Sequence, residues 1–270
     1  MSINTINVGN LEYLTAEGID LPHCFTTRFG GVSEGYLSSL NLGIHRGDDP
    51  RNVEKNYEIL GEALGFDIHD LVFTRQTHTD IVRVVDEENR GEGLQREVEP
   101  ECDALVTNTP GLVLAAFSAD CTPILLHDTV TGAVGAVHAG WRGTAAGIVS
   151  KAVAAMVTSF GCRAEDICAA IGPNIGPCCF ETDRDVPDAM IAALGDSAVP
   201  YIQSAENKFH VDLKGLNALW LHHSSVTNIE ISTDCTACAP NRFWSHRITS
   251  GKRGSQGAVI VCKEGRLCNG

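Results

Sequence analysis

Two histidines and one cysteine in this chain are of the types that could hold a metal ion. His78 lies in Gln-Thr-His, Cys121 lies in Ala-Asp-Cys-Thr-Pro, and His138 opens the stretch His-Ala-Gly-Trp-Arg-Gly. Two imidazoles and one thiolate suit a zinc ion that keeps a fourth position open for water or substrate. The same ligands suit copper, so ligand type alone does not fix the metal. Their spacing does not match a local zinc finger, so the fold must bring them together.

The same residues allow other roles. A cysteine after an apolar run is commonly a small buried hydrophobe, and a histidine at a strand end commonly packs against its neighbours. Cys121 could also be a nucleophile paired with His138 or His78, as in cysteine hydrolases. Both the ligand and the nucleophile need a lowered thiol pKa, so sequence does not separate them. Asp120 either orients a histidine or hydrogen-bonds the backbone of its own turn.

A candidate anion site follows His138. We expect a strand, a Gly-rich turn and a helix over residues 132–160, with the helix starting at about Thr144. Backbone N–H groups at Gly143 and Thr144 would stabilise an anion, and Arg142 would add a charge-assisted donor. Arg28, in a Gly-rich loop where backbone can approach closely, is a second candidate. Alternatively, the glycines serve only turns and both arginines are surface residues.

The other cysteines are weaker signals. Cys235 and Cys238 form a lone CxxC without a second pair at finger spacing, and Cys178-Cys179 is expected to be structural. The count of 11 cysteines is odd, and the N-terminus has no basic region followed by an apolar core. These are therefore expected to be free thiols in a reducing compartment, which predicts a cytoplasmic protein.

Composition narrows the classes of function. The 270 residues are 43% hydrophobic and 20% charged, which is typical of a globular protein, and we expect one domain over residues 1–270. The net charge of −14 argues against nucleic-acid partners and against an anionic membrane surface. The apolar runs are too short for a spanning helix. We expect a monomer that acts on small molecules.

Strands and helices alternate irregularly along the chain, which predicts an α+β fold with mixed β-sheets and packed helices. The charged segment 86–101 is expected to be a solvated loop, with a lid over a site as the alternative. The expected strands cover residues 21–27, 81–85, 112–116, 122–126, 132–138, 167–171 and 258–262, with another near Ile229; besides the helix from Thr144, helices are expected at 52–64, 185–194 and 213–222.

Seven stretches resemble the YfiH family, also called the polyphenol-oxidase or laccase-domain family, which includes purine nucleoside phosphorylases related to FAMIN. The resemblance runs in order from about Phe25 to about Val261. The family usually has Tyr where His246 stands, and its Gly-Arg reads Gly251-Lys252 here. The stretches are Phe25–Ser33, Ser39–Gly43, Asp103–Thr107, Ala119–Cys121, His138–Gly143, Ile171–Pro173 and Phe243–Arg247.

This resemblance implies phosphate-dependent cleavage of adenosine, inosine or methylthioadenosine, with adenosine deamination as a companion activity. It implies a metal site for zinc, with copper as another possibility. It also leaves three rivals: copper-dependent phenol oxidation, amide hydrolysis by the Cys-His pair in editing peptidoglycan precursors, and a non-enzymatic zinc protein. The implied metal ligands are His78, Cys121 and His138, the catalytic residues Cys121, His138 and Arg142, and the substrate or phosphate contacts Arg28, Asn41, Arg142 and Gly143.

Overall fold

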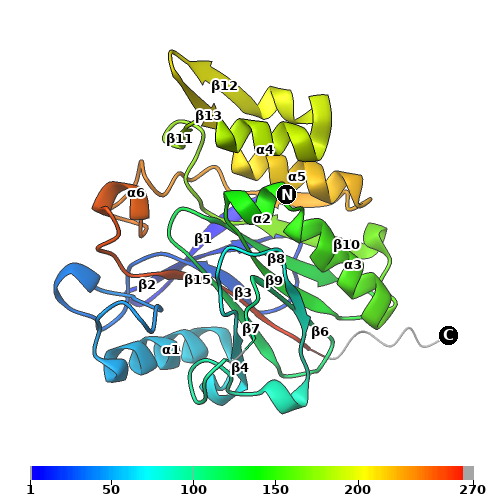
Figure 1. The fold of residues 1–270 in the computed structure, drawn as a ribbon. Coiled ribbons are helices and arrows are strands. Elements are labelled where there is room, and N and C mark those ends of the chain that lie inside the picture. The colour runs from blue at the N-terminus through cyan, green and yellow to red at the C-terminus, as the bar shows by residue number, and fades with distance from the viewer. Residues whose placement is uncertain (1, 99, 264–270) are drawn as a thin grey trace.

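Two six-stranded mixed sheets form the centre of the protein in a computed structural model, which describes residues 2–98 and 100–263 (Figure 1). In spatial order, the first sheet contains β1 (Ile3–Val8), β2 (Leu11–Ala16), β3 (His23–Thr26), β15 (Gln256–Val261), β7 (Val113–Ser118) and β4 (Leu71–Phe73). The second contains β14 (Asn228–Ile231), β10 (Ile167–Ile171), β8 (Thr122–Asp128), β9 (Val134–Ala139), β6 (Ala104–Thr107) and β5 (Val82–Val84).

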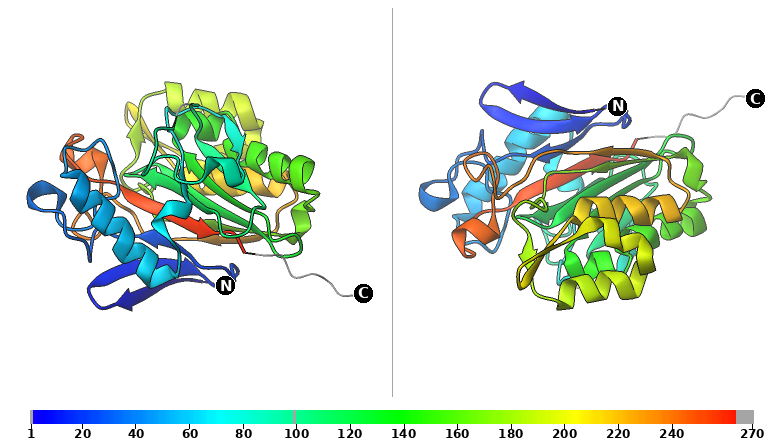
Figure 2. Two further views of the ribbon diagram at one scale, coloured as in Figure 1. Left: turned by 90° about the horizontal axis from the view of Figure 1, so that it is seen from below. Right: turned by 90° about the horizontal axis from the view of Figure 1, so that it is seen from above.

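The two sheets pack face to face and helices cover their outer faces. The core between the sheets includes Phe25 and Leu114 from the first and Leu125 and Ala136 from the second. On the outer face of the first sheet lies α1 (Pro50–Leu64), and on that of the second lies α3 (Ile148–Phe160) (Figure 2). The neighbouring α5 (Leu213–His223) packs against α3.

A smaller layer lies at one end of the second sheet, at the top of Figure 1. It combines α4 (Asp185–Leu194) and α5 with a three-stranded sheet, and these elements share their own apolar cluster. No helix in the described ranges is long and apolar enough to cross a membrane. The remaining elements are β11 (Glu181–Thr182), β12 (Ile202–Ala205), β13 (Lys208–Val211), α2 (Trp141–Ala145), α6 (His246–Thr249), and short 3-10 helices at 35–37, 68–70, 87–89, 164–166 and 195–201.

The predicted α+β fold with mixed sheets is confirmed. The apolar stripe of α1 is buried on the first sheet, and the helix ends at Gly65 in the left-handed conformation, as its sequence indicates. Strand β10 and helix α4 occupy the residues predicted for them. Strands β1 and β12 were not predicted, because their side chains are mostly exposed or half-buried and lack a clear apolar pattern.

The helix predicted from Thr144 was wrong in its start. Instead, the short helix α2 begins at Trp141, and Gly147 (φ 71°) separates it from α3. A Cβ at Gly147 would lie 3.3 Å from the Trp220 ring, so glycine also allows close packing there. The N–H of Thr144 donates to the Gly140 carbonyl within α2. That N–H is therefore unavailable to an anion.

The charged segment 86–101 is not simply solvated. Glu92 is buried and pairs with Arg83, and Arg90 pairs with Asp70. Residues 93–98 line a cavity of about 820 Å³. The expectation of a plain solvated loop was wrong, because ion pairs join the segment to Arg83 in β5 of the second sheet and to Asp70 just before β4 of the first; residue 99 lies outside the described residues.

Candidate metal centre and adjoining cavity

The register of the second sheet brings Cys121 and His138 together. Thr122 at the start of β8 pairs with Ala139 near the end of β9, and Pro123 pairs with His138. Cys121 and Gly140, one residue beyond the paired ends, therefore face each other. A Cβ built on Gly140 would lie 3.3 Å from the Cys121 sulfur.

His78 reaches the same place through Asp103. His78 lies in the loop between β4 and β5, with a positive φ of 64°. Asp103 is fully buried at the start of β6, and its carboxylate accepts the backbone N–H groups of Thr77, His78 and Thr79 at 3.2, 3.1 and 2.7 Å. The same carboxylate lies 2.7 Å from Nδ1 of His138. One buried side chain thus fixes both the His78 loop and the His138 ring.

The three side chains have the separations that a metal site needs. One ligand atom each from His78, Cys121 and His138 lies within 4.8 Å of the other two. The Cys121 sulfur is 3.8 Å from Nε2 of His78, and the two imidazole rings meet edge to face at 5.1 Å. With bonds of about 2.0–2.3 Å to zinc, ligand atoms around one tetrahedral ion stand roughly 3.3–3.8 Å apart.

The electrostatics of the site favour a thiolate. Burial raises the pKa of the Cys121 thiol, but the charge of His138 and hydrogen bonds to both histidines outweigh it, and the pKa is lowered to about 6. Burial lowers the pKa of His138, but the charge of Cys121 and the Asp103 hydrogen bond raise it to about 9. Burial raises the pKa of Asp103, but its interactions with His138 and Thr79 lower it to about 2.

Position 140 needs a glycine because there is no room for a side chain. Its φ of −68° is open to any residue. However, a Cβ there would lie only 2.8 Å from Cδ2 of His78, in addition to its contact with Cys121. Any larger residue would push on two of the three candidate ligands at once.

Asp120 has neither of its two predicted roles: among the described residues, its carboxylate bonds segments distant in the sequence, not a histidine or its own turn. Its φ is 89°, a conformation that costs energy in a non-glycine residue. The Asp120 carboxylate accepts hydrogen bonds from the Thr236 hydroxyl at 2.6 Å and from the backbone N–H of Arg247 at 2.7 Å. Its backbone carbonyl accepts the backbone N–H of Ile175 at 2.9 Å. These contacts fix the backbone just before Cys121.

The two arginines that were predicted to contact an anion, Arg142 and Arg28, differ in how far other protein groups already engage them. Arg142 is exposed in the first turn of α2 and stacks on Trp141, next to Gly143 and just after Gly140. Arg28 instead stacks on Trp244 and donates three of its five N–H groups to backbone carbonyls.

Asn41 is buried, and its amide is engaged within the protein. It donates to the Gly43 carbonyl and the Asp48 carboxylate, and it accepts the N–H groups of Gly43 and Ser255. These four bonds use the hydrogen-bonding capacity of the amide. Through its bond to Ser255, Asn41 is placed to hold the segment 253–255 in position.

Arg46 and Arg253 were not identified from the sequence. Burial and the charge of Arg46 lower the pKa of Arg253 to about 10, although Cys121 and Asp120 are close enough to oppose this with their negative charges. The Nε of Arg253 is buried without a hydrogen-bond partner among the described residues. The basic pair Lys252-Arg253 after a glycine was the available signal for Arg253. Asp103 opens the family-like stretch Asp103–Thr107, but that stretch did not indicate a role for its side chain.

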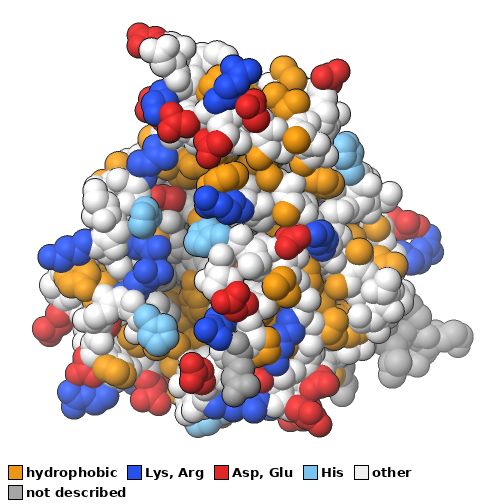
Figure 3. All heavy atoms as spheres, viewed as in Figure 1, with side chains coloured by type: hydrophobic (Ala, Val, Ile, Leu, Met, Phe, Trp, Pro, Cys, Tyr) orange, Lys and Arg blue, Asp and Glu red, His pale blue; other side chains and the backbone are white. Residues whose placement is uncertain are grey.

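The cavity of about 820 Å³ lies beside this group. Its lining includes Arg46, Gln76 and Ser255, so it adjoins both the His78 loop and the Arg253 segment. Phe73 and Phe117, in edge-to-face contact at 4.9 Å, form an apolar part of its wall. On this face of the molecule, histidine and basic side chains gather around a hollow (Figure 3).

Comparison with known proteins places this site in a family context. Residues 22–263 match the family model described as multi-copper polyphenol oxidoreductase laccase. The chain is 41% identical over 251 residues to a purine nucleoside phosphorylase of Deinococcus radiodurans, covering 93% of this chain and 92% of that protein. It is 38% identical over 244 residues to the purine nucleoside phosphorylase YlmD of Geobacillus stearothermophilus, covering 88% and 89%.

The fold is also that of a solved structure. The hypothetical protein YfiH of Bacillus licheniformis superposes with a TM-score of 0.91 at 34% identity, over 97% of this chain and 99% of that one. Likeness of this extent in both sequence and fold shows common descent. The chain therefore belongs to the YfiH family.

Proposed function

We propose that this protein is a purine nucleoside phosphorylase that cleaves adenosine, inosine and methylthioadenosine with phosphate at a zinc site, with adenosine deamination as a companion activity. The names of its relatives support phosphorolysis. The observation that carries the proposal is the convergence of His78, Cys121 and His138 within 4.8 Å, beside a cavity bordered by arginines.

The residues present fit a zinc ion. Asp103 holds Nδ1 of His138, which leaves Nε2 as the ligand atom and fixes the ring direction. The lowered pKa of Cys121 provides the thiolate that a metal requires. When bound, zinc supplies a Lewis acid that polarises substrate oxygen or lowers the pKa of a bound water to about 7.

The arginines would bind and orient phosphate. Arg253 offers a buried Nε that has no hydrogen-bond partner in the described part of the chain, Arg46 adds a second positive charge, and Arg142 lies on the α2 side of the site. In phosphorolysis a phosphate oxygen bonds to C1′ of the ribose as the bond from C1′ to the purine nitrogen breaks. The base leaves with a proton and ribose 1-phosphate remains. The three arginines would align the phosphate for this attack.

The cavity has room for the nucleoside. Its volume of about 820 Å³ lies in the range of small-molecule sites, which is roughly 300–1,000 Å³. The Phe73 and Phe117 rings offer an apolar wall for a purine, and the lining also includes Gln76, two residues before His78, and Ser255, two residues after Arg253. A lining that combines aromatic rings with polar side chains supports a substrate with an apolar base and a polar ribose.

One observation favours a second function. A thiolate at Cys121 beside a protonated His138 is also the resting state of a cysteine nucleophile. An amide hydrolase acting on peptidoglycan precursors is therefore the alternative. Copper-dependent phenol oxidation is less well supported, because the other candidate ligand cluster in the described residues consists only of cysteines.

Product analysis on protein of known metal content tests the proposal. With inosine and phosphate, we expect hypoxanthine and ribose 1-phosphate in equal amounts, and no release in the Cys121→Ala variant. Ammonia release from adenosine measures the companion activity. Release of a free amino acid from a peptidoglycan precursor without ribose 1-phosphate would establish the hydrolase instead, and oxygen uptake with phenols alone would establish the oxidase.

A further inference from the structure

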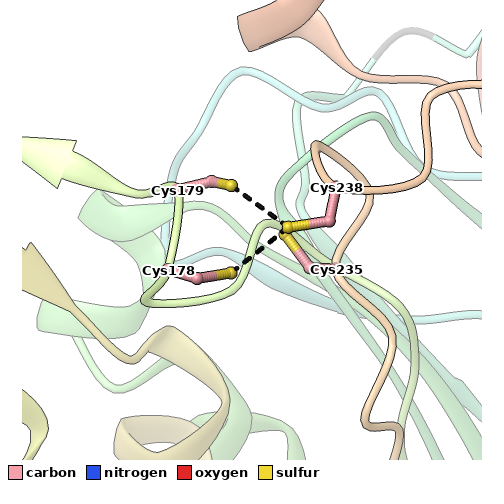
Figure 4. A group of neighbouring side chains, drawn as sticks. All are labelled: Cys178, Cys179, Cys235 and Cys238. Atoms are coloured by element: carbon pink, nitrogen blue, oxygen red, sulfur yellow. Dashed lines mark hydrogen bonds between the residues drawn. The ribbon is translucent and has the colours of Figure 1, made fainter.

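A second cluster of metal-type side chains lies away from His78. Cys178 and Cys179 follow β10 in the loop that leads to β11, and Cys235 and Cys238 lie in the loop after β14. Figure 4 shows the four sulfur atoms turned toward one another from these two loops. We propose that these four cysteines bind a structural zinc ion, separate from the site at His78, Cys121 and His138.

The sulfur positions match one tetrahedral ion. All four sulfur atoms lie within 4.8 Å of one another. Cys238 is 3.5 Å from Cys178 and 3.4 Å from Cys179. Four thiolates at about 2.3 Å from zinc would be roughly 3.8 Å apart, so small movements complete the site. A disulfide would need about 2.05 Å, and all four cysteines are free thiols in the structure.

The sequence signal for this site was incomplete. Cys235 and Cys238 have the CxxC spacing of a zinc half-site, but the second pair is the adjacent Cys178 and Cys179. An adjacent pair does not match the spacing of a zinc finger, so the sequence alone does not connect it with the CxxC motif. Only the pairing of β10 with β14, as parallel neighbours, places the two loops side by side.

The surroundings are suited to a dianionic metal–tetrathiolate site. The N–H of Gly176 donates to the Cys235 sulfur at 3.1 Å, as second-sphere groups commonly do around metal ligands. The buried ammonium of Lys214 donates to the carbonyls of Ser232 and Asp234, just before Cys235. A buried cation at that place would be stabilised by the negative charge of four thiolates around one divalent ion.

The cluster joins loops that support the first site. Thr236 donates its N–H to the Asn174 carbonyl, which bridges the two cysteine loops. From these loops, Thr236 and Ile175 bond to Asp120, and Asn174 bonds to Thr122 at 2.7 Å. Asp120 and Thr122 flank Cys121. A zinc ion at the four cysteines would therefore stabilise the backbone that positions Cys121.

Metal counting tests the proposal directly. Wild-type protein purified from zinc-containing, copper-free medium should carry two zinc ions per chain, measured by elemental analysis and native mass spectrometry. Cys238→Ser should carry one and melt at a lower temperature, and Cys121→Ala should also carry one. Cys162→Ala, which changes a buried free cysteine just after α3, is the matched control and should keep both.

X-ray absorption identifies the ligands and covers the case in which Cys238→Ser does not fold. Zinc in the Cys121→Ala variant should show a shell of four sulfur atoms at about 2.3 Å. Titration of this variant with a mercurial reagent should release the zinc ion as four thiols react with the reagent. A folded Cys121→Ala protein without zinc, zinc bound there through nitrogen or oxygen, or disulfides among the four cysteines would each overturn the proposal.

Discussion

The carboxylate of Asp103 lies 2.7 Å from Nδ1 of His138 and also accepts the backbone N–H of His78 at 3.1 Å. A single buried carboxylate therefore sets the orientation of one candidate metal ligand and the loop position of another. This arrangement leaves Nε2 of His138 free to face Cys121. It makes Asp103 the residue on which the geometry of the site depends most, although its own side chain is not one of the three ligands.

Replacing Asp103 with Asn should weaken metal binding while leaving the three ligands in place. The amide has one oxygen instead of two, so it cannot accept all the bonds that hold the His78 loop and the His138 ring. Loss of such a second-sphere partner typically lowers metal affinity roughly 10–100-fold. Competition with a chromophoric chelator measures the change. Asp183→Asn, at an exposed aspartate paired with Lys208, is the control; equal affinity in both variants would contradict the role of Asp103.

Gly140→Ala should reduce metal affinity more than stability. The new methyl group would lie 2.8 Å from Cδ2 of His78 and 3.3 Å from the Cys121 sulfur. Relieving such a clash costs about 1–3 kcal/mol, or roughly ten- to a hundredfold in affinity if the ligands must move. Gly135→Ala is the matched control, because the atoms nearest to its Cβ would belong to Val106 and Leu126, which are not candidate ligands. That control should alter thermal stability without altering metal affinity; the reverse pattern would refute the steric argument.

The arginine variants should separate phosphate binding from nucleoside binding. Arg253→Ala and Arg142→Ala should raise the apparent KM for phosphate more than that for inosine, because each removes a charge-assisted donor. The expected loss is ~1.5–3 kcal/mol, or roughly ten- to a hundredfold. Arg28→Ala should also lower the melting temperature, since this side chain holds the Ser38 and Pro240 carbonyls. Steady-state kinetics against Arg184→Ala, at an exposed arginine, provides the comparison, and unchanged phosphate dependence would exclude these contacts.

Metal affinity at the first site should rise with pH. Without metal, the pKa of Cys121 is about 6 and that of His138 about 9, so between these values the thiol has lost its proton and the imidazole has kept it. A metal must displace the His138 proton, so affinity increases up to about tenfold per pH unit across this range and levels off above it. Below pH 6 the dependence should steepen, because Cys121 also carries a proton. Calorimetry in buffers of different ionisation enthalpy counts the released protons; a flat affinity between pH 6 and 9 would contradict this pairing.

Copper loading should change the activity without revealing the native reaction. Copper binds most sites of nitrogen and sulfur ligands more tightly than zinc, so the site can hold it. We expect zinc-loaded, copper-free protein to cleave nucleosides and to leave phenols unoxidised. Both activities are measured on one preparation of known metal content. Nucleoside cleavage that is absent with zinc, together with phenol oxidation that appears on copper loading, would favour the oxidase.

The sequence alone determined the α+β class and most of the central elements, because their apolar patterns are strong and local. It also singled out His78, Cys121 and His138, since ligand chemistry can be read from residue type and flanking motif. What it could not show was the role of Asp103, because an aspartate before a strand has many possible partners and only the pairing of β6 with β9 selects His138.

Tertiary structure also decided where the other charges and thiols lie. Arg28 and Arg253 have the same side chain, yet Arg28 donates from Nε and both terminal nitrogens to backbone carbonyls, whereas the buried Nε of Arg253 has no partner among the described residues. The adjacent pair Cys178-Cys179 finds its CxxC partner only because β10 and β14 are neighbours. Such relationships join residues far apart in the chain through sheet register, and local sequence patterns carry no information about which distant strand will become a neighbour.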